Sequence, residues 1–240
     1  MRALSASDLL KVWERGLGDG PIGRALELLR AGCPEAGVDA LAGLSIGQRD
    51  ALLLRLRQHT FGPDLTGASE CPGCGEPIEL ALRAADLFAG EAAAEVAVEL
   101  DGYQLRLRPP NSRDLVTASH PNLAQARMEL LEQCVIEARY QGAVASAADL
   151  PDAVIDLAER RLAEADPDSD IRIRTACPAC GAEQRMTFDI VGFFWREIDA
   201  WSQRMLREVH TLAMAYGWGE DEILALGPVR RQCYLDLVGV

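Results

Sequence analysis

The sequence predicts an α+β fold that is predominantly helical, with helices around a small β unit. Apolar residues recur at three- and four-residue steps in several segments, most regularly from Phe193 to Tyr216, which indicates amphipathic helices. Two short motifs, CPGCG at 71–75 and CPACG at 177–181, are each followed by the alternating pattern of a strand. We call these motifs knuckle 1 and knuckle 2. Two alternating segments near 95–108 also surround Asp101-Gly102, which is a type I′ hairpin signal.

The first third of the chain carries start signals for helices. Ser5 or Ser7 can cap the segment DLLKVWERGL, and Pro21 occupies a favourable first-turn position before IGRALELLRAG. Ser45, followed three residues later by Gln48, forms a capping box for IGQRDALLLRLRQHTFG. Knuckle 1 then leads into IELALR, which alternates as a strand does, and the alanine-rich segment 88–96 is expected to be a loop.

The rest of the chain is also mainly helical in pattern. Ser112 starts a short helix, and longer helices are expected over 121–140 and 146–167. The segments DIRIRTA and QRMTFDI, before and after knuckle 2, are predicted strands. A helix with a wide apolar stripe follows over 193–216, and two short helices separated by Gly227-Pro228 end the sequence.

The composition bounds the classes of function. Of 240 residues, 49% are apolar and 25% are charged, which is an ordinary globular balance. The 24 basic and 37 acidic residues give a net charge of −13, which disfavours nucleic acid and anionic membranes as partners. No apolar run approaches the ~20 residues of a membrane span. Charges stand where a signal peptide needs its apolar stretch, so we expect a reducing cytoplasm as the location.

Four of the seven cysteines have the spacing of metal ligands. A structural zinc ion takes four tetrahedral ligands, and each Cys-x-x-Cys turn offers two thiolates. Cys71, Cys74, Cys177 and Cys180 are therefore predicted to hold one Zn²⁺. The 102 residues between the pairs far exceed the ~15–20 of a common zinc ribbon. Four thiolates leave no open position for water, so we expect a structural ion rather than a catalytic one.

Other interpretations of the cysteines remain open at this point. A thioredoxin-like redox pair sits at a strand-to-helix junction, whereas both knuckles lead into strands. Two independent disulfides, or no metal at all, are further alternatives. Cys33, Cys134 and Cys233 stand alone and are interpreted as residues outside the site. Weak similarity continues past the knuckles at a shift of 106 residues, which leaves a longer internal repeat open.

The predicted organisation follows from these elements. An N-terminal helical region is expected over 1–60 and a C-terminal helical region over 193–240. Between them, 61–192 would form a zinc-ribbon-like unit with a long, mainly helical insertion between the knuckles. No flexible linker divides the chain, so we expect one compact domain overall.

The sequence shows no constellation of catalytic residues. It has three histidines and lacks a phosphate loop, a nucleophile elbow and a Rossmann fingerprint. The acidic segment ADPDSD at 165–170 lacks the spacing of an EF-hand, so we expect a solvated loop there. We therefore expect neither an enzyme nor a small-molecule substrate.

The C-terminal third resembles a known family. The run from Phe193 to Val238, preceded by CPACG, is similar to the T-even-phage-type baseplate hub assembly chaperones, whose relatives accompany phage-like contractile injection systems. The shared positions form a long helix ending LAxxYGW, then EIL-L, then RR--YL. They are Leu212, Tyr216, Gly217, Trp218, Glu222, Ile223, Leu224, Leu226, Arg230, Arg231, Tyr234 and Leu235. RPPNSRDL at 108–115 resembles a strand-to-helix corner of the same group. Gly219 departs from the pattern, since a capping Ser often stands there.

The resemblance implies a non-enzymatic function. The chain would be an assembly chaperone or a minor component of a contractile-tail baseplate hub, binding other baseplate proteins in the cytoplasm and in some cases entering the finished particle. Tyr216 and Trp218 would be core residues or exposed anchors for the partner, and Tyr234 is a third candidate. Arg230 and Arg231 are expected on the surface and are further candidates for contact with the partner, through its acidic residues. The alternative is a zinc-ribbon protein associated with nucleic acid or transcription, which the charge of −13 opposes.

Overall fold

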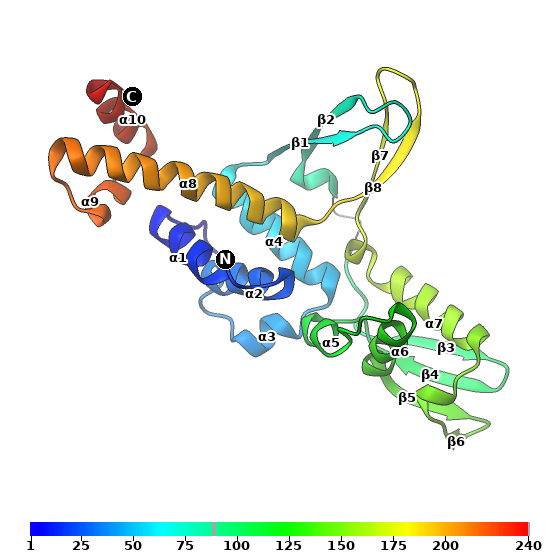
Figure 1. Ribbon diagram of the computed structural model, residues 1–240. Helices are drawn as coiled ribbons and strands as arrows, with labels where there is room; N and C mark the ends of the chain where they lie inside the picture. The colour runs from blue at the N-terminus through cyan, green and yellow to red at the C-terminus, as the bar shows by residue number, and fades with distance from the viewer. Residues whose placement is uncertain (88–89, 240) are drawn as a thin grey trace.

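The computed structural model describes residues 1–87 and 90–239. Figure 1 shows a central helical body with three extensions: two β-hairpins on one side, a mixed lobe at one end and a helical tip at the other. Within the described residues the strands form three small antiparallel sheets. The prediction of a mainly helical α+β protein is thus confirmed in this general form. Of the loop expected over 88–96, residues 88 and 89 lie outside the described residues.

The helical body begins where the sequence signals place its helices. Ser5 caps α1 (Ala6–Gly16), and its side chain accepts a hydrogen bond from the Asp8 N–H in a capping box. α2 (Pro21–Gly32) starts at its proline, and α3 (Val38–Ala42) is one short turn. Ser45 and Gln48 form the predicted capping box of α4 (Ile46–Phe61). Local capping chemistry therefore sets these starts.

The core of this body lies between α1, α2, α4 and the first half of α8 (Ile190–Tyr216). Phe194, Leu28 and Leu53 are fully buried in it. Two glycines allow the closest approaches between helices. A Cβ on Gly16 would lie 2.4 Å from the Trp195 ring, and one on Gly32 would lie 2.5 Å from the Leu56 side chain. Close packing of α1 on α8 thus depends on the missing side chain of Gly16.

A buried arginine joins three segments beside the core. The Arg57 guanidinium, at the end of α4, donates two hydrogen bonds to the Glu197 carboxylate on α8, at 2.9 and 2.6 Å. It also donates to the carbonyls of Gly62 and Asp64, both at 2.7 Å. Asp64 is the first residue of β1 (Asp64–Glu70), which pairs with β2 (Pro77–Arg83). Arg57 therefore holds the base of the first hairpin against α8.

The mixed lobe has a hydrophobic core of its own. Its sheet has the order β3 (Val96–Leu100), β4 (Tyr103–Leu107), β5 (Val135–Tyr140) and β6 (Ala143–Val144). The helices of the lobe are α5 (Ser112–Thr117), α6 (Leu123–Cys134) and α7 (Asp152–Ala165). The β3–β4 turn is the predicted hairpin, since Asp101 and Gly102 both have positive φ, 50° and 83°.

One predicted element in this lobe is wrong. The sequence pattern indicated a single helix over 121–140, but the helix ends at Cys134 and the chain continues directly as β5. Val135 and Ile136 are β-branched and favour a strand. β4 also offers an unpaired edge, and Leu105 pairs with Ala138 across it. The long-range pairing therefore overrides the local helical pattern.

The acidic segment 165–170 also differs from the prediction. Asp166 is only 1% exposed, and Asp168, inside a 3₁₀ turn (Pro167–Ser169), is buried as well. The Asp166 carboxylate accepts a hydrogen bond of 2.9 Å from the Gly47 N–H in the first turn of α4. Asp166 thus provides an acceptor for one of the free N–H groups at the N-terminus of a helix that lies 119 residues away in the sequence. The segment thus connects the lobe to the body instead of being solvated.

The tip consists of the second half of α8 with α9 (Glu220–Leu224) and α10 (Pro228–Val238). Gly217 ends α8 in the left-handed conformation at φ 69°, as glycine does at many helix ends. Ile223 and Leu235 bury α9 and α10 against α8, and Gly227-Pro228 separates the two short helices as predicted. None of the helices in the described ranges has the length and apolarity that a membrane crossing needs.

The contact between Gly16 and Trp195 gives a test of this packing. We expect Gly16→Ala to destabilise the fold by about 1–3 kcal/mol, because the new methyl group overlaps a buried ring. Helix propensity alone predicts that Gly16→Ala would stabilise the fold, because alanine favours a helix more than glycine does. The measurement is the free energy of unfolding by urea.

Gly18→Ala is the matched control, because a Cβ at Gly18 meets nothing within 4 Å and its φ lies outside the left-handed region. It should shift the free energy by less than about 0.5 kcal/mol. Equal stability of the two variants would contradict the close approach of α1 to α8.

Candidate metal centre

Each knuckle is the turn of a β-hairpin. Knuckle 1 joins β1 to β2, and knuckle 2 joins β7 (Arg172–Ala176) to β8 (Glu183–Thr187). In knuckle 1 the Cys71 N–H donates to the Glu76 carbonyl at 2.9 Å, and the Gly75 N–H donates to the Cys71 carbonyl at 2.8 Å.

Knuckle 2 repeats this hydrogen-bond pattern. The Cys177 N–H donates to the Ala182 carbonyl and the Gly181 N–H to the Cys177 carbonyl, both at 2.9 Å. Gly75 and Gly181 have φ of 77° and 73°, a left-handed conformation that glycine adopts without strain. The shared glycine is therefore required by the turn, and the two knuckles are copies in structure as well as in sequence.

The structure brings the four predicted ligands together. Their sulfur atoms all lie within 4.8 Å of one another. Cys71 Sγ is 3.7 Å from Cys180 Sγ, and Cys74 Sγ is 3.6 Å from Cys177 Sγ, so each contact joins one knuckle to the other. Four sulfurs placed tetrahedrally at about 2.3 Å from one ion would be ~3.8 Å apart. The cluster therefore has the size of a Cys₄ metal site.

The site is half enclosed. Cys71 and Cys177 are buried, whereas Cys74 and Cys180 are exposed, so each hairpin supplies one ligand of each kind. Ile78, with Leu80 and Ala182, packs beside the two buried cysteines. All seven cysteines are free, and the three that were expected to lie outside the site do so.

The pKa values of two thiols show how the cluster would ionise. The N–H groups of Gly73 and Cys74 donate toward the Cys71 sulfur and lower the pKa of its thiol to about 7. At Cys74 the Glu76 N–H lowers the pKa of the thiol, but the Cys180 sulfur, desolvation of the Cys74 sulfur inside the cluster and the other two thiols have a larger effect and raise this pKa to about 12. Adjacent thiols thus oppose full ionisation, and a bound dication would offset that repulsion.

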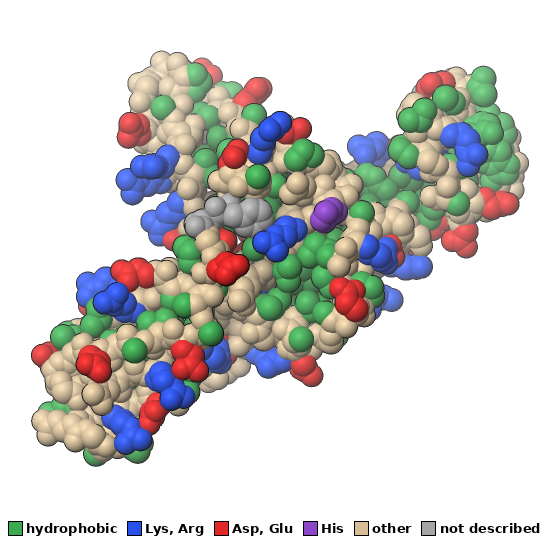
Figure 2. Space-filling view, turned by 180° about the vertical axis from the view of Figure 1, so that it is seen from behind, with side chains coloured by type: hydrophobic (Ala, Val, Ile, Leu, Met, Phe, Trp, Pro, Cys, Tyr) green, Lys and Arg blue, Asp and Glu red, His purple; other side chains and the backbone are tan. Residues whose placement is uncertain are grey.

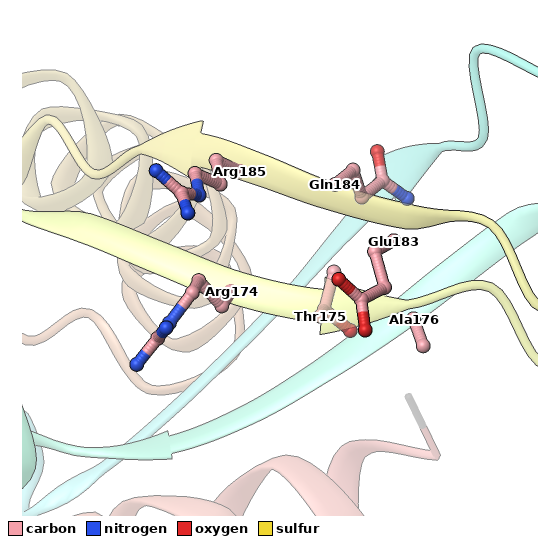
Figure 3. Close-up of a pocket in the computed structure, with 6 residues that line it drawn as sticks. All are labelled: Arg174, Thr175, Ala176, Glu183, Gln184 and Arg185. Carbon is pink, nitrogen blue, oxygen red and sulfur yellow. The ribbon is translucent and has the colours of Figure 1, made fainter.

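Apolar residues of both hairpins line a shared cleft below the knuckles. Ile173 and Met186 of the second hairpin line it together with Leu80 and Leu82 of the first. On the outer face, Arg174 and Arg185 are cross-strand partners, and Figure 3 shows both side chains projecting from neighbouring strands toward the same side. They line a shallow hollow of about 490 Å³ with Thr175, Ala176, Glu183 and Gln184.

The residues predicted to contact a partner lie at the other end of α8. The Tyr216 and Trp218 rings stack with centroids 4.7 Å apart, and Tyr234 meets Trp218 edge-on at 4.8 Å. We call these three residues the aromatic cluster. Tyr216 is exposed, whereas Trp218 and Tyr234 are half-buried. The cluster therefore closes the tip and also reaches its surface.

The two arginines of the tip differ. Arg230 is exposed, as expected. The expectation for Arg231 is wrong, because its side chain is buried. It donates to the Glu208 carboxylate at 2.7 Å and to the Leu226 carbonyl at 3.2 Å, which fixes α10 to α8. Its guanidinium is already engaged within the chain.

Sequence reasoning missed the residues that hold the hairpins in place. Arg57 lies in an Arg-rich helix that gives no sign of which arginine is buried. β1, with the sequence DLTGASE, lacks the alternation of a strand and forms because β2 pairs with it. Only the repeated cysteines signalled that the two hairpins meet.

Comparison with known proteins identifies one family. A family model described as "T4 bacteriophage base plate protein" matches residues 19–195. The match includes both knuckles, the mixed lobe and most of the helical body, and it ends near the start of α8. No curated protein and no solved structure matches the chain.

The geometry predicts that the four cysteines act as one unit around one ion. Cys71→Ser and Cys177→Ser should each destabilise the metal-loaded protein, because either change removes a ligand from the same site. The double variant should cost little more than either single one, since the site is already lost. The measurement is the free energy of unfolding of the wild type, the two single variants and the double variant. The departure of the double variant from additivity gives the coupling energy between the two cysteines.

Cys233→Ser is the control, because Cys233 is exposed and lies outside the cluster. It should change the free energy of unfolding by less than about 0.5 kcal/mol. Additive effects of the two ligand substitutions would show that the knuckles work separately.

Proposed function

The chain belongs to the T4 bacteriophage base plate protein family, and from this membership we propose that it is a non-enzymatic assembly chaperone or minor component of a baseplate hub. It acts in a contractile tail or a tail-like injection particle, by binding other baseplate proteins. The observation that carries the proposal is the match over residues 19–195. The C-terminal resemblance rests mainly on residues after that range, so two parts of the chain support the same class of function.

The arrangement of the site supports a structural role. In this proposal the four cysteines hold one Zn²⁺ in a zinc-ribbon-like unit made of the two hairpins. Thiolates favour zinc over the hard cations Mg²⁺ and Ca²⁺, and a Cys₄ set leaves no coordination position for a substrate. The ion crosslinks two segments 102 residues apart and contributes its binding free energy to folding.

Binding to other baseplate proteins would use the exposed tip. The aromatic cluster supplies large, rigid side chains, and Arg230 lies beside Val229 on the same exposed helix. Tyr, Trp and Arg are enriched among the residues that contribute most to protein interfaces. Assembly would take place in the cytoplasm, where the thiols stay reduced.

Zinc content is the direct test of the metal proposal. Native mass spectrometry should show one zinc ion per chain, because one site uses all four ligands. Cys74→Ser should lose the ion, whereas Cys233→Ser should keep it. Two ions per chain, or none in protein purified with zinc present, would overturn the shared zinc site.

Particle assembly tests the proposed function. Deleting the gene in a producing cell should abolish complete particles, and the wild-type gene should restore them. Quantitative mass spectrometry of purified particles then separates the two roles. A fixed number of copies per particle identifies a component, and absence from finished particles identifies a chaperone. Normal particles in the deletion strain would contradict both.

A further inference from the structure

Two arginines stand directly opposite each other on the outer face of the second hairpin. Arg174 on β7 and Arg185 on β8 are cross-strand partners, and both are exposed. Their side chains project from neighbouring strands toward the same side (Figure 3). The Cβ atoms of such partners are only about 5 Å apart, and like charges in this position destabilise a sheet. The hairpin therefore carries two positive charges that its own folding does not favour.

Neither of these two arginines is neutralised within the part of the chain that the structure describes. No carboxylate there lies within ion-pair distance of either guanidinium, although Glu183 lines the same hollow. The other arginines that lie in described strands are all ion-paired, and they are Arg83, Arg106, Arg139 and Arg172.

The other two sheets pair opposite charges across their strands. In the first hairpin, Arg83 is the cross-strand partner of Asp64, and their charged groups are 3.6 Å apart. In the mixed lobe, Arg106 is the cross-strand partner of Glu137, at 3.7 Å. Opposite charges in these positions stabilise a sheet. The pair on the second hairpin therefore departs from an arrangement that the rest of the chain follows.

This basic pair also contrasts with the charge of the whole chain. The net charge is −13, so the surface as a whole repels acidic partners. Figure 2 shows basic side chains together at the outer edge of the projection at the upper left, which the two hairpins form. The hollow beside the pair is shallow and lined mainly by polar side chains. It is therefore suited to a surface contact rather than to an enclosed small molecule.

We propose that the outer face of the second hairpin binds an acidic segment of another protein, with a carboxylate of that segment between Arg174 and Arg185. A guanidinium presents a fork of N–H donors that matches a carboxylate. Two guanidiniums on neighbouring strands can donate to the same carboxylate from both sides. The contact neutralises the like-charged pair, which nothing in the described chain does.

Glu183 sets the orientation of the bound segment. It lies two residues before Arg185 on β8, so both side chains are on one face, and Glu183 is nearer knuckle 2. A second carboxylate at that end would be repelled. The segment therefore places its acidic residues over the arginines and a neutral or basic residue toward the knuckle. A continuous phosphate backbone does not fit this pattern.

An NMR titration with a synthetic peptide tests the proposal. The probe is TETETKT, which carries two glutamates and a lysine beyond them, added to isotope-labelled full-length protein at about 0.15 M salt. Charges more than about 8 Å away are largely screened under these conditions. The Nε–H signals of Arg174 and Arg185 should shift, with a dissociation constant of about 1 mM, because the contact consists of exposed ion pairs.

Variants separate this site from general charge effects. The double variant Arg174→Gln with Arg185→Gln should bind about tenfold more weakly, because both donors are lost. Arg207→Gln is the matched control and should bind as wild type does. Arg207 is an exposed arginine on α8 without an ion pair among the described residues, so the same charge is removed elsewhere. The peptide TQTQTKT should not bind.

Stability gives a second and independent readout. Arg174→Glu places an opposite charge across from Arg185, so the urea midpoint of unfolding should rise while peptide binding is lost. A purely structural role of Arg174 predicts a lower midpoint instead, and that result would overturn the proposal.

Other results would overturn it as well. They are no binding by the wild type, an equal loss in Arg207→Gln, and tighter binding of oligothymidylate than of the peptide, which would make nucleic acid the ligand. Self-association of the purified chain that the double variant abolishes would make a second copy the partner. Because the probe is a synthetic peptide and this surface is separate from the tip, such a failure leaves the proposed baseplate function untouched.

Discussion

The meeting of two hairpins that are far apart in the sequence is the constraint on which the structure depends. Closing a flexible loop of 102 residues costs about 4 kcal/mol in chain entropy beyond a constant term. Contacts within the helical body offset this entropy cost before any ion binds. Arg57 holds the start of β1 against α8, and α8 begins three residues after β8 ends. Both hairpins therefore extend from the same side of the body, and the four sulfur atoms meet at the turns of the two hairpins. An ion at that point adds to an arrangement that packing already favours.

Because the two hairpins meet, the chain between them, which forms the mixed lobe, starts and ends close to the body. The lobe is built entirely from chain between the two hairpins, and its hydrophobic core is separate from that of the body. Such an insertion needs connections at its base so that it does not move freely. Asp166 supplies one, because its carboxylate accepts from the Gly47 N–H of α4. The N-terminus of a helix in the body is thus completed by a residue of the insertion. Removing the Asp166 carboxylate would leave the buried Gly47 N–H without this acceptor.

The sequence allowed prediction of the features that local chemistry determines. The capping boxes at Ser5 and Ser45, the turn at Asp101-Gly102 and the paired knuckles all depend on residues within a few positions of one another. The features that were predicted wrongly depend instead on residues far away in the sequence. β5 is a strand because β4 pairs with it, and Arg231 is buried because its guanidinium donates to the Glu208 carboxylate on another helix. These outcomes depend on tertiary neighbours that no local pattern specifies. The clustering of the four cysteines was predictable because the chemistry of a complete ligand set requires it.

α8 links the second hairpin to the tip. It is one helix of 27 residues, about 40 Å long, that starts at the base of the second hairpin and ends at the aromatic cluster. Its first half is buried in the body, where Trp195 fills the space left open by Gly16. Its second half carries α9 and α10 outward on a separate small core. Because a helix held at one end transmits its orientation to the other, the hairpins and the body fix the direction of the tip. The region that the family model matches ends near the start of α8, so it fixes the direction of the tip that lies beyond it.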